Sequence, residues 1–243
     1  MSTIRGARER ARTEITAAIK NEARDQLAAE GAARLSLRAV ARELGMASSA
    51  LYRYFPSRDD LLTALIVDAY DAVGTAAESA LAATPPTAGH CPRWTAVCSA
   101  VRAWALAHPH EYALIYGSPV PGYTAPKDTV APASRVALAL ISVIRDAHRT
   151  NGLALPPLSD RLRQEAERMA ADFAPDLPPP VVAAMVAAWS QVFGTISFEL
   201  FGHFHNVVQD RDAFFEHAAT RLAHEVGLRP QVGGASQGDG AGS

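Results

Sequence analysis

Residues 35–58 read LSLRAVARELGMASSALYRYFPSR, and this stretch decides the fold of the chain. Ser36 can cap a short helix, since a serine hydroxyl accepts a hydrogen bond from the free amide groups of a first helical turn. The apolar residues that follow keep the i, i+3, i+4, i+7 spacing of one helix face; they are Leu37, Val40, Ala41 and Leu44. Gly45 predicts the end of this helix after barely two turns.

A second short helix is predicted to begin at Ser48 or Ser49 and to end near Phe55, because Pro56 disfavours helical geometry in the residue before it. Two short helices joined by a glycine-containing turn have the dimensions of a helix-turn-helix, whose second helix enters the major groove of DNA. Packing alone could also produce such a hairpin, since short helical hairpins with an internal glycine are common in all-helical proteins.

Helical geometry assigns a role to each side chain of the second helix. At about 100° per residue, Leu51 and Phe55 share the face that turns to the core, so Ser49 and Arg53 point outward. Outward side chains can meet base edges, as when arginine pairs with guanine, whereas hydroxyl groups on the flanks suit phosphate oxygens. The predicted DNA-binding residues are Ser36, Arg38, Ser48, Ser49, Tyr52, Arg53, Tyr54 and Arg58.

Positive charge is concentrated around this motif, although the whole chain carries a net charge of -2. Residues 1–58 hold 11 lysine and arginine residues against 6 aspartate and glutamate residues, whereas residues 59–243 hold 12 against 19. A basic end of this kind is typical of a nucleic-acid partner. We expect residues 1–11 to be a flexible basic arm and residues 12–58 to be the helix-turn-helix DNA-binding domain.

Downstream of the motif the sequence predicts helices throughout. Ser57 caps a long helix that reaches about Ala83, and further helices are expected at 92–108, 109–116, 128–149, 158–172, 179–206 and 210–226. The fold class is therefore all-α, with an N-terminal three-helix DNA-binding domain and a larger helical bundle over residues 59–228. Residues 229–243 are rich in glycine and serine and are expected to be a disordered tail.

The block from Leu35 to Arg58 resembles the N-terminal domain of the TetR family of bacterial regulators, and the likeness extends over roughly residues 12–66. The resemblance implies a homodimeric repressor that binds a palindromic operator in double-stranded DNA and releases it when a small-molecule effector binds. Arg58 stands where the family commonly has lysine. Because arginine keeps the charge, we expect the phosphate contact to persist.

Residues 108–126 resemble the C-terminal domain of one TetR subgroup. That subgroup also carries a Trp-x-x-x-His-Gly pattern, which Trp189 to Gly194 match except that Phe193 replaces the histidine. Aromatic side chains gather in this half of the chain and could line a cavity for a small apolar or aromatic ligand. The predicted ligand contacts are Trp104, Tyr112, Tyr116, Trp189 and Phe193.

The helices at 179–206 and 210–226 are predicted to form a dimer interface. Their apolar stripes are Phe198, Phe201 and His205 on the first helix and Phe214, Ala218 and Leu222 on the second. A monomer could bury both stripes internally. A two-fold interface, however, would set two recognition helices about one DNA turn, ~34 Å, apart.

Other classes of function are disfavoured by the residue pattern. The histidine spacings place no complete ligand set on one helix face, so we expect no metal and no cofactor. Ser118 lies in a loop without the strand-turn-helix elbow of a hydrolase nucleophile, so we expect no enzyme activity. We see no apolar run of bilayer length and no export signal, which predicts a cytoplasmic protein with no membrane partner.

Two alternatives stay open. The chain could be a small-molecule-binding or catalytic helical protein in which the N-terminal helices serve only for packing. It could also bind DNA as an activator, which the sequence does not distinguish from a repressor.

Overall fold

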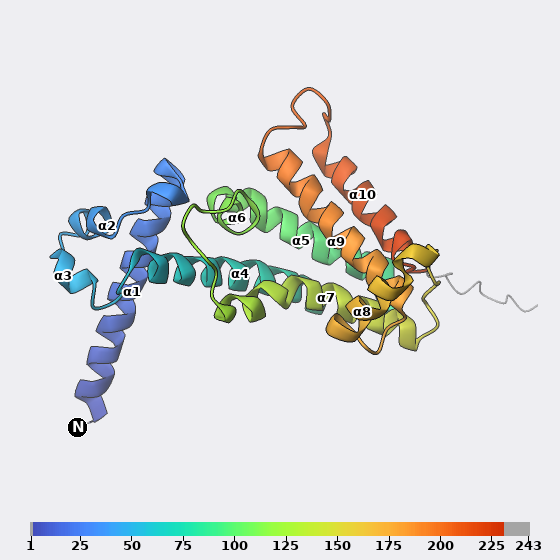
Figure 1. Ribbon diagram of the computed structural model, residues 1–243, viewed down its shortest axis with the longest axis horizontal. Helices are drawn as coiled ribbons and strands as arrows, with labels where there is room; N and C mark the ends of the chain where they lie inside the picture. Colours follow the sequence, from blue (N-terminus) through green and yellow to red (C-terminus); the bar gives the residue numbers. More distant parts are fainter. Residues whose placement is uncertain (1, 231–243) are drawn as a thin grey trace, which may run out of the picture. The chain divides into compact units, whose positions relative to one another are not determined.

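The computed structural model describes the backbone of residues 2–230 and the side chains of residues 6–230 (Figure 1). This part of the chain is built from helices, and the one β-type pairing within it is an isolated bridge between Leu153 and Leu228. The all-α prediction is confirmed. Most of the predicted tail, residues 231–243, lies outside the described residues.

The chain divides into two compact units. Unit 1 comprises the residues up to Ala76 together with Val101–Arg135, and unit 2 comprises Ala77–Ala100 together with the residues from Val136 onward. The predicted boundary at residue 58 therefore does not coincide with a boundary between compact units.

Unit 1 begins with α1 (Ser2–Glu30), whose residues Ile19, Ala23 and Leu27 are buried at a spacing of four residues, as on one face of a helix. Residues 2–11, which we expected to be a flexible arm, are instead the first turns of this helix. Gly31 ends the helix: it adopts a φ of 79°, and its amide donates to the Leu27 carbonyl at 3.0 Å.

A short turn, η1 (Ala32–Arg34), leads to α2 (Leu37–Glu43) and α3 (Ser48–Leu51). Ser36 caps α2 as predicted, since its Oγ accepts a hydrogen bond from the Ala39 amide at 3.4 Å. Gly45 adopts a φ of 63°, which reverses the chain between the two helices. α3 is shorter than expected, since it ends at Leu51. Residues 52–55 form a turn instead, in which Phe55 N donates to Leu51 O at 3.1 Å.

We call residues 2–66 the head. Leu51 is fully buried in its core, and α4 (Arg58–Ala83) adds the buried residues Leu61 and Leu62. The core also receives residues from α6 (Pro109–Tyr116) and the loop after it; these are Leu114, Ile115, Val120 and Tyr123. Unit 1 extends past residue 58 because these later segments cover the head core.

The remaining helices are α5 (His90–Ala107), α7 (Val130–Arg149), α8 (Arg163–Phe173), α9 (Pro179–Leu200) and α10 (Arg211–Glu225), with the short turns η2 (Pro86–Ala88), η3 (Lys127–Thr129) and η4 (Asp160–Leu162). Within unit 2, α9 packs against both α8 and α10. We expected this helix to reach residue 206, but α9 ends at Leu200. Gly202 adopts a φ of 82°, and the His203 amide donates a hydrogen bond to the Phe198 carbonyl at 2.9 Å, so the chain leaves the helix there.

α9 is also the one helix among the described residues that is long and apolar enough to cross a membrane by length and composition alone. From the sequence alone we expected no apolar run of bilayer length. Within its most apolar window 44% of the residues are buried inside the protein, and the core helix of a soluble protein passes the same test.

The buried position of Leu51 predicts how the head responds to truncation. Leu51→Ala should lower the free energy of unfolding of the head by about 2–5 kcal/mol, since it leaves a cavity in a closed core. Urea unfolding followed by circular dichroism measures the change. Ser49→Ala, at an exposed position of the same helix, is the control; equal stability of the two variants would contradict the packing described here.

Candidate DNA-binding site

The recognition surface is set by which side chains of residues 48–55 are buried. Leu51 and Phe55 lie in the head core, as the helical geometry predicted. Ser48, Ser49 and Arg53 are exposed, and the Tyr52 side chain is 42% exposed. The side chains assigned to base edges therefore stand on the solvent side of α3 and its following turn.

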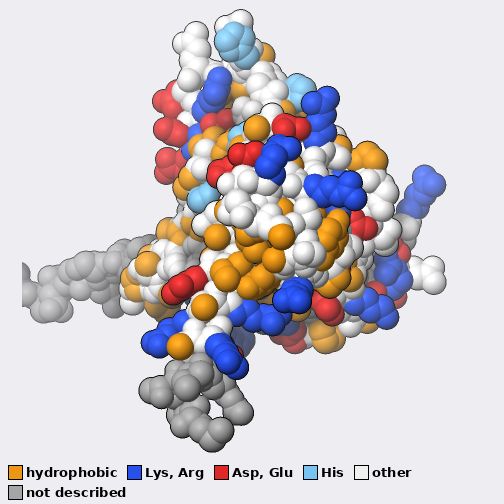
Figure 2. Space-filling model, turned by 90° about the vertical axis from the view of Figure 1, so that its left-hand side faces the viewer, with side chains coloured by type: hydrophobic (Ala, Val, Ile, Leu, Met, Phe, Trp, Pro, Cys, Tyr) orange, Lys and Arg blue, Asp and Glu red, His pale blue; other side chains and the backbone are white. Residues whose placement is uncertain are grey.

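Figure 2 looks onto the left-hand end of the view in Figure 1, the end that carries α2 and α3. Lysine and arginine side chains are spread over this face around an area of hydrophobic surface. Arg38 and Arg42 of α2 are both exposed, although Arg42 pairs with Glu43 through Nε and Oε1 at 3.2 Å. Exposed cations beside exposed hydroxyl groups suit a surface that meets phosphates.

Tyr54 has a partner on α1 that the sequence did not indicate. The Arg12 guanidinium lies 5.7 Å from the centre of the Tyr54 ring, within cation–π range. Arg12 thus connects α1 to the turn after α3.

Arg58 occupies the first position of α4 and donates hydrogen bonds to backbone carbonyls. Its Nη2 donates to Ala32 O at 2.8 Å and to Ala33 O at 3.4 Å, and its Nε donates to Leu35 O at 3.2 Å. The side chain is only 29% exposed and also pairs with Asp59 at 3.6 Å. Arg58 therefore fixes the start of α4 to the segment that precedes α2, and its phosphate contact stays a prediction.

An ion-pair network connects α1, α4 and α6 within unit 1. Asp68 of α4 accepts from Lys20 Nζ and Arg24 Nη2 of α1, each at 2.8 Å. Arg24 Nε also lies 3.3 Å from Glu111 Oε1 of α6. Sequence reasoning missed this network, since residues 40 or more positions apart leave no local pattern.

The loop after α6 is hydrogen-bonded to α4. The hydroxyl groups of Thr63 and Tyr123 lie 2.9 Å apart, and the Tyr70 hydroxyl donates to the Ile115 carbonyl at 3.3 Å. A displacement of α4 would therefore act on α1 and on the loop through defined polar contacts.

The predicted ligand contacts fall into both units. In unit 1, Trp104 and Tyr112 are buried, and the rings of Tyr112 and Tyr116 are 5.2 Å apart between centroids. Burial raises the pKa of the Tyr116 hydroxyl, with smaller contributions from Tyr70 and Tyr112, so it is neutral at neutral pH. In unit 2, the rings of Trp189 and Phe193 are 5.4 Å apart, and Phe193 is buried.

Among the residues that the structure describes, no group of three or more histidine, cysteine, aspartate or glutamate side chains is arranged to hold a metal ion.

Comparison with known proteins adds two family matches. Residues 19–65 match the description "Bacterial regulatory proteins, tetR family", and residues 94–222 match "Tetracyclin repressor-like, C-terminal domain". Neither match identifies the Trp-His-Gly subgroup, which stays a prediction.

Individual relatives are similar along most of the chain. The HTH-type transcriptional regulator Rv1816 of Mycobacterium tuberculosis H37Rv is 40% identical over 229 residues, which are 89% of this chain and 94% of that protein. The solved structure of the putative regulatory protein SCO4313 is 32% identical in sequence, with a TM-score of 0.73. The match covers 89% of this chain and 98% of the SCO4313 chain. RolR, solved with its ligand resorcinol, matches with a TM-score of 0.50 at 16% identity. The match covers 91% of this chain and 97% of the RolR chain, and it shows a likeness of fold alone. The family matches and the Mycobacterium tuberculosis regulator indicate a DNA-binding regulator rather than an enzyme.

The carbonyl contacts of Arg58 predict a difference between two substitutions. Both Arg58→Ala and Arg58→Lys should lower the free energy of unfolding, by about 1–3 kcal/mol for alanine. Alanine has no donor, and the compact ammonium of lysine does not match the three carbonyls that the planar guanidinium of Arg58 spans. Urea unfolding measures both, with Arg38→Lys on exposed α2 surface as the control. Full stability of Arg58→Lys would show instead that only the charge at this position matters.

Proposed function

Because the chain belongs to the TetR family of bacterial transcriptional regulators, we propose that it is a homodimeric repressor that binds a palindromic operator through α3. The observation that supports this proposal is the arrangement of residues 48–55, with Leu51 and Phe55 in the core and Ser48, Ser49 and Arg53 exposed. Such a regulator acts where the DNA is, which in a bacterium is the cytoplasm.

Each predicted DNA-binding residue has a proposed role at the operator. Arg53 donates to a guanine edge, and Ser48 and Ser49 contact neighbouring bases. Tyr52, Tyr54, Ser36 and Arg38 contact phosphates and fix the register of the head. Arg58 acts on DNA binding mainly as a positioning residue, since its guanidinium is occupied by backbone carbonyls.

A second copy of the chain is the proposed occupant of the face of α9 and α10. Phe198 and Phe214 are 53% and 42% exposed, and the ring of Phe204 contacts both edge to face, with ring centroids 5.8 and 5.4 Å away. Exposed aromatic clusters of this kind mark interaction surfaces. Leu222, which we had assigned to the same stripe, is buried inside the unit and takes no part in the proposed interface.

A small apolar or aromatic effector is proposed as the signal. Trp104, Tyr112 and Tyr116 in unit 1 and Trp189 and Phe193 in unit 2 are its proposed contacts, each group to be tested by itself. Binding would shift α4, whose first turn holds Arg58 and whose Asp68 pairs with α1. A shift there would change the spacing of two heads and release the operator. RolR, which binds resorcinol, has a similar fold.

Operator binding predicts distinct effects for a base contact and a phosphate contact. Arg53→Ala should weaken binding to a duplex selected from a random pool by about 5- to 150-fold, with a smaller loss on random DNA. Tyr52→Phe should weaken binding to both duplexes by a similar factor. Fluorescence anisotropy measures both affinities, and Arg161→Ala at an exposed site of η4 is the control. Unchanged affinity of Arg53→Ala for the selected duplex would contradict the assignment.

The dimer proposal predicts the effect of charge on the aromatic face. Phe198→Glu combined with Phe214→Glu should convert a dimer of 25.8 kDa chains into monomers, since two carboxylates would be buried in an apolar interface. Sedimentation velocity at micromolar concentration distinguishes the two states. Leu155→Glu, at an exposed apolar site on another loop of unit 2, should leave the dimer intact. A monomeric wild-type protein would refute the proposal.

A further inference from the structure

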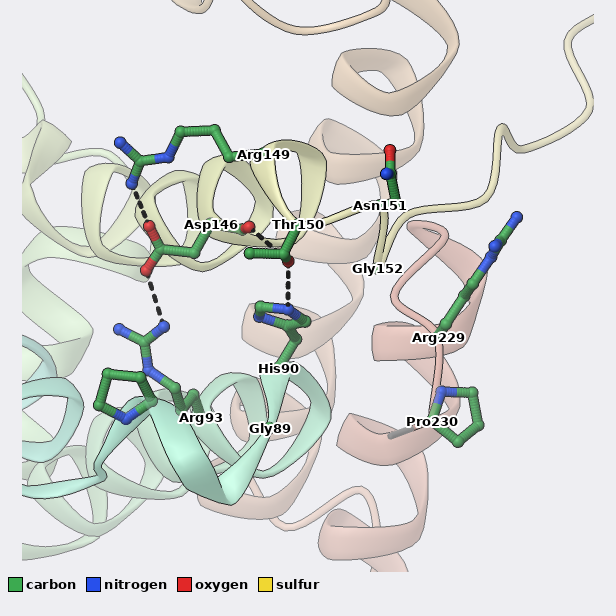
Figure 3. Close-up of a pocket in the computed structure, with 11 residues that line it drawn as sticks. Gly89, His90, Arg93, Asp146, Arg149, Thr150, Asn151, Gly152, Arg229 and Pro230 are labelled. Carbon is green, nitrogen blue, oxygen red and sulfur yellow. Dashed lines mark hydrogen bonds and ion pairs between the residues drawn. The ribbon is translucent and has the colours of Figure 1, made fainter. Parts of the chain in front are cut away.

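Unit 2 contains a pocket of about 640 Å³ that the function described above does not use (Figure 3). It lies where the first turn of α5, the last turn of α7 and the segment after α10 meet. The side chains that matter for its chemistry are His90, Arg93, Asp146, Arg149, Thr150 and Arg229. Its volume is within the range of small-molecule sites.

The wall of this pocket is fixed by backbone pairing between distant segments. Ala154 N donates to Gly227 O at 2.7 Å, and Arg229 N donates to Gly152 O at 2.9 Å, on either side of the Leu153–Leu228 bridge. Gly152 packs closely on His90, since a Cβ at position 152 would lie 2.8 Å from His90 Cδ2. The pocket is therefore a built feature of the fold rather than a gap between mobile loops.

Asp146 neutralises part of the positive charge on this wall. Its Oδ2 accepts from Arg93 Nη1 at 2.7 Å, and its Oδ1 pairs with Arg149. Arg93 is only 8% exposed, and its Nε is buried with no hydrogen-bond partner among the described residues. The Arg93 guanidinium therefore adds positive charge beside the pocket, whereas its buried Nε is not itself exposed to a ligand.

His90 is held as a hydrogen-bonded neutral side chain. Thr150 Oγ1 donates to the Asp146 carbonyl at 2.9 Å, so it accepts from His90 Nε2, 3.0 Å away. Burial, with the nearby charge of Arg93, lowers the pKa of His90, which favours the neutral ring at neutral pH. With His90 neutral, the charged side chains of the lining are three arginines, Arg93, Arg149 and Arg229, and one carboxylate, Asp146.

Arg149 and Arg229 stand on opposite sides of the His90–Thr150 pair (Figure 3). Arg229 is exposed, and no hydrogen bond or ion pair of its side chain occurs within residues 6–230. Arginine binds carboxylates and phosphates through two parallel N–H donors, which suits a pocket with an excess of such groups.

We propose that this pocket binds a small organic anion through a carboxylate or phosphate group held by Arg229, on a wall whose positive charge Arg149 and Arg93 increase. The site is separate from the aromatic residues proposed to contact the effector, and its chemistry is different. It goes beyond the proposed function, and its test requires neither DNA nor the effector.

The test titrates the full chain with citrate and with inorganic phosphate, each against sodium chloride of equal ionic strength, by isothermal calorimetry and thermal denaturation. We expect saturable binding of at least one of the two, and the tighter one identifies the group that is recognised. Arg229→Ala and Arg149→Glu should each weaken that binding roughly tenfold or more. Arg161→Ala, at an exposed position of η4 outside the pocket, should leave it unchanged.

Two results would overturn the proposal. One is that neither anion binds more tightly than chloride. The other is that Arg229→Ala and Arg161→Ala bind the anion equally, which would indicate general attraction to a charged surface. Circular dichroism of the variants shows that they are folded, and the oligomeric state and DNA affinity of Arg229→Ala should match those of the wild-type protein.

Discussion

Burial of Leu51 and Phe55 in the head core is the constraint on which the DNA-binding surface depends. α3 has only four residues, too few to hold its own orientation through helical hydrogen bonds. The two buried side chains fix it instead. Because the helical period sets the remaining directions, Ser49 and Arg53 are exposed as a consequence. The recognition surface is thus a product of core packing.

α4 closes that core and also makes the polar contacts that position the head. Its residues Leu61 and Leu62 pack inside, its Arg58 holds the segment before α2, and its Asp68 holds α1. A single rigid helix therefore connects three parts of the head. This arrangement gives the proposed effector mechanism a physical basis, since the parts of the head held by α4 would move together with it.

Features of the fold that depend on neighbouring residues were predictable from the sequence. The Ser36 cap and the turn at Gly45 arise from a hydrogen bond and a φ angle within a few residues, so their signals are local. α9 was predicted to be too long because the stop at Gly202 lies in an otherwise apolar helical pattern.

Contacts between distant residues left no such signal. The carbonyl partners of Arg58 lie 23 to 26 positions away, and Arg229 reaches Gly152 across the bridge between two loops. The sequence showed that Arg58 belongs to the DNA-binding block but not that its guanidinium is directed at the protein backbone. The anion pocket, whose residues come from three separate segments, could not be predicted at all.

The salt dependence of DNA binding tests the central claim most directly. We expect the exposed face of α2 and α3 to bind DNA through several phosphates. In that case the logarithm of the association constant should fall linearly as the logarithm of the salt concentration rises. The slope should be roughly -0.9 for each phosphate that is neutralised. The account predicts a steep slope that becomes less steep by about one when Arg38 is replaced by alanine. Absence of DNA affinity at low salt would contradict it.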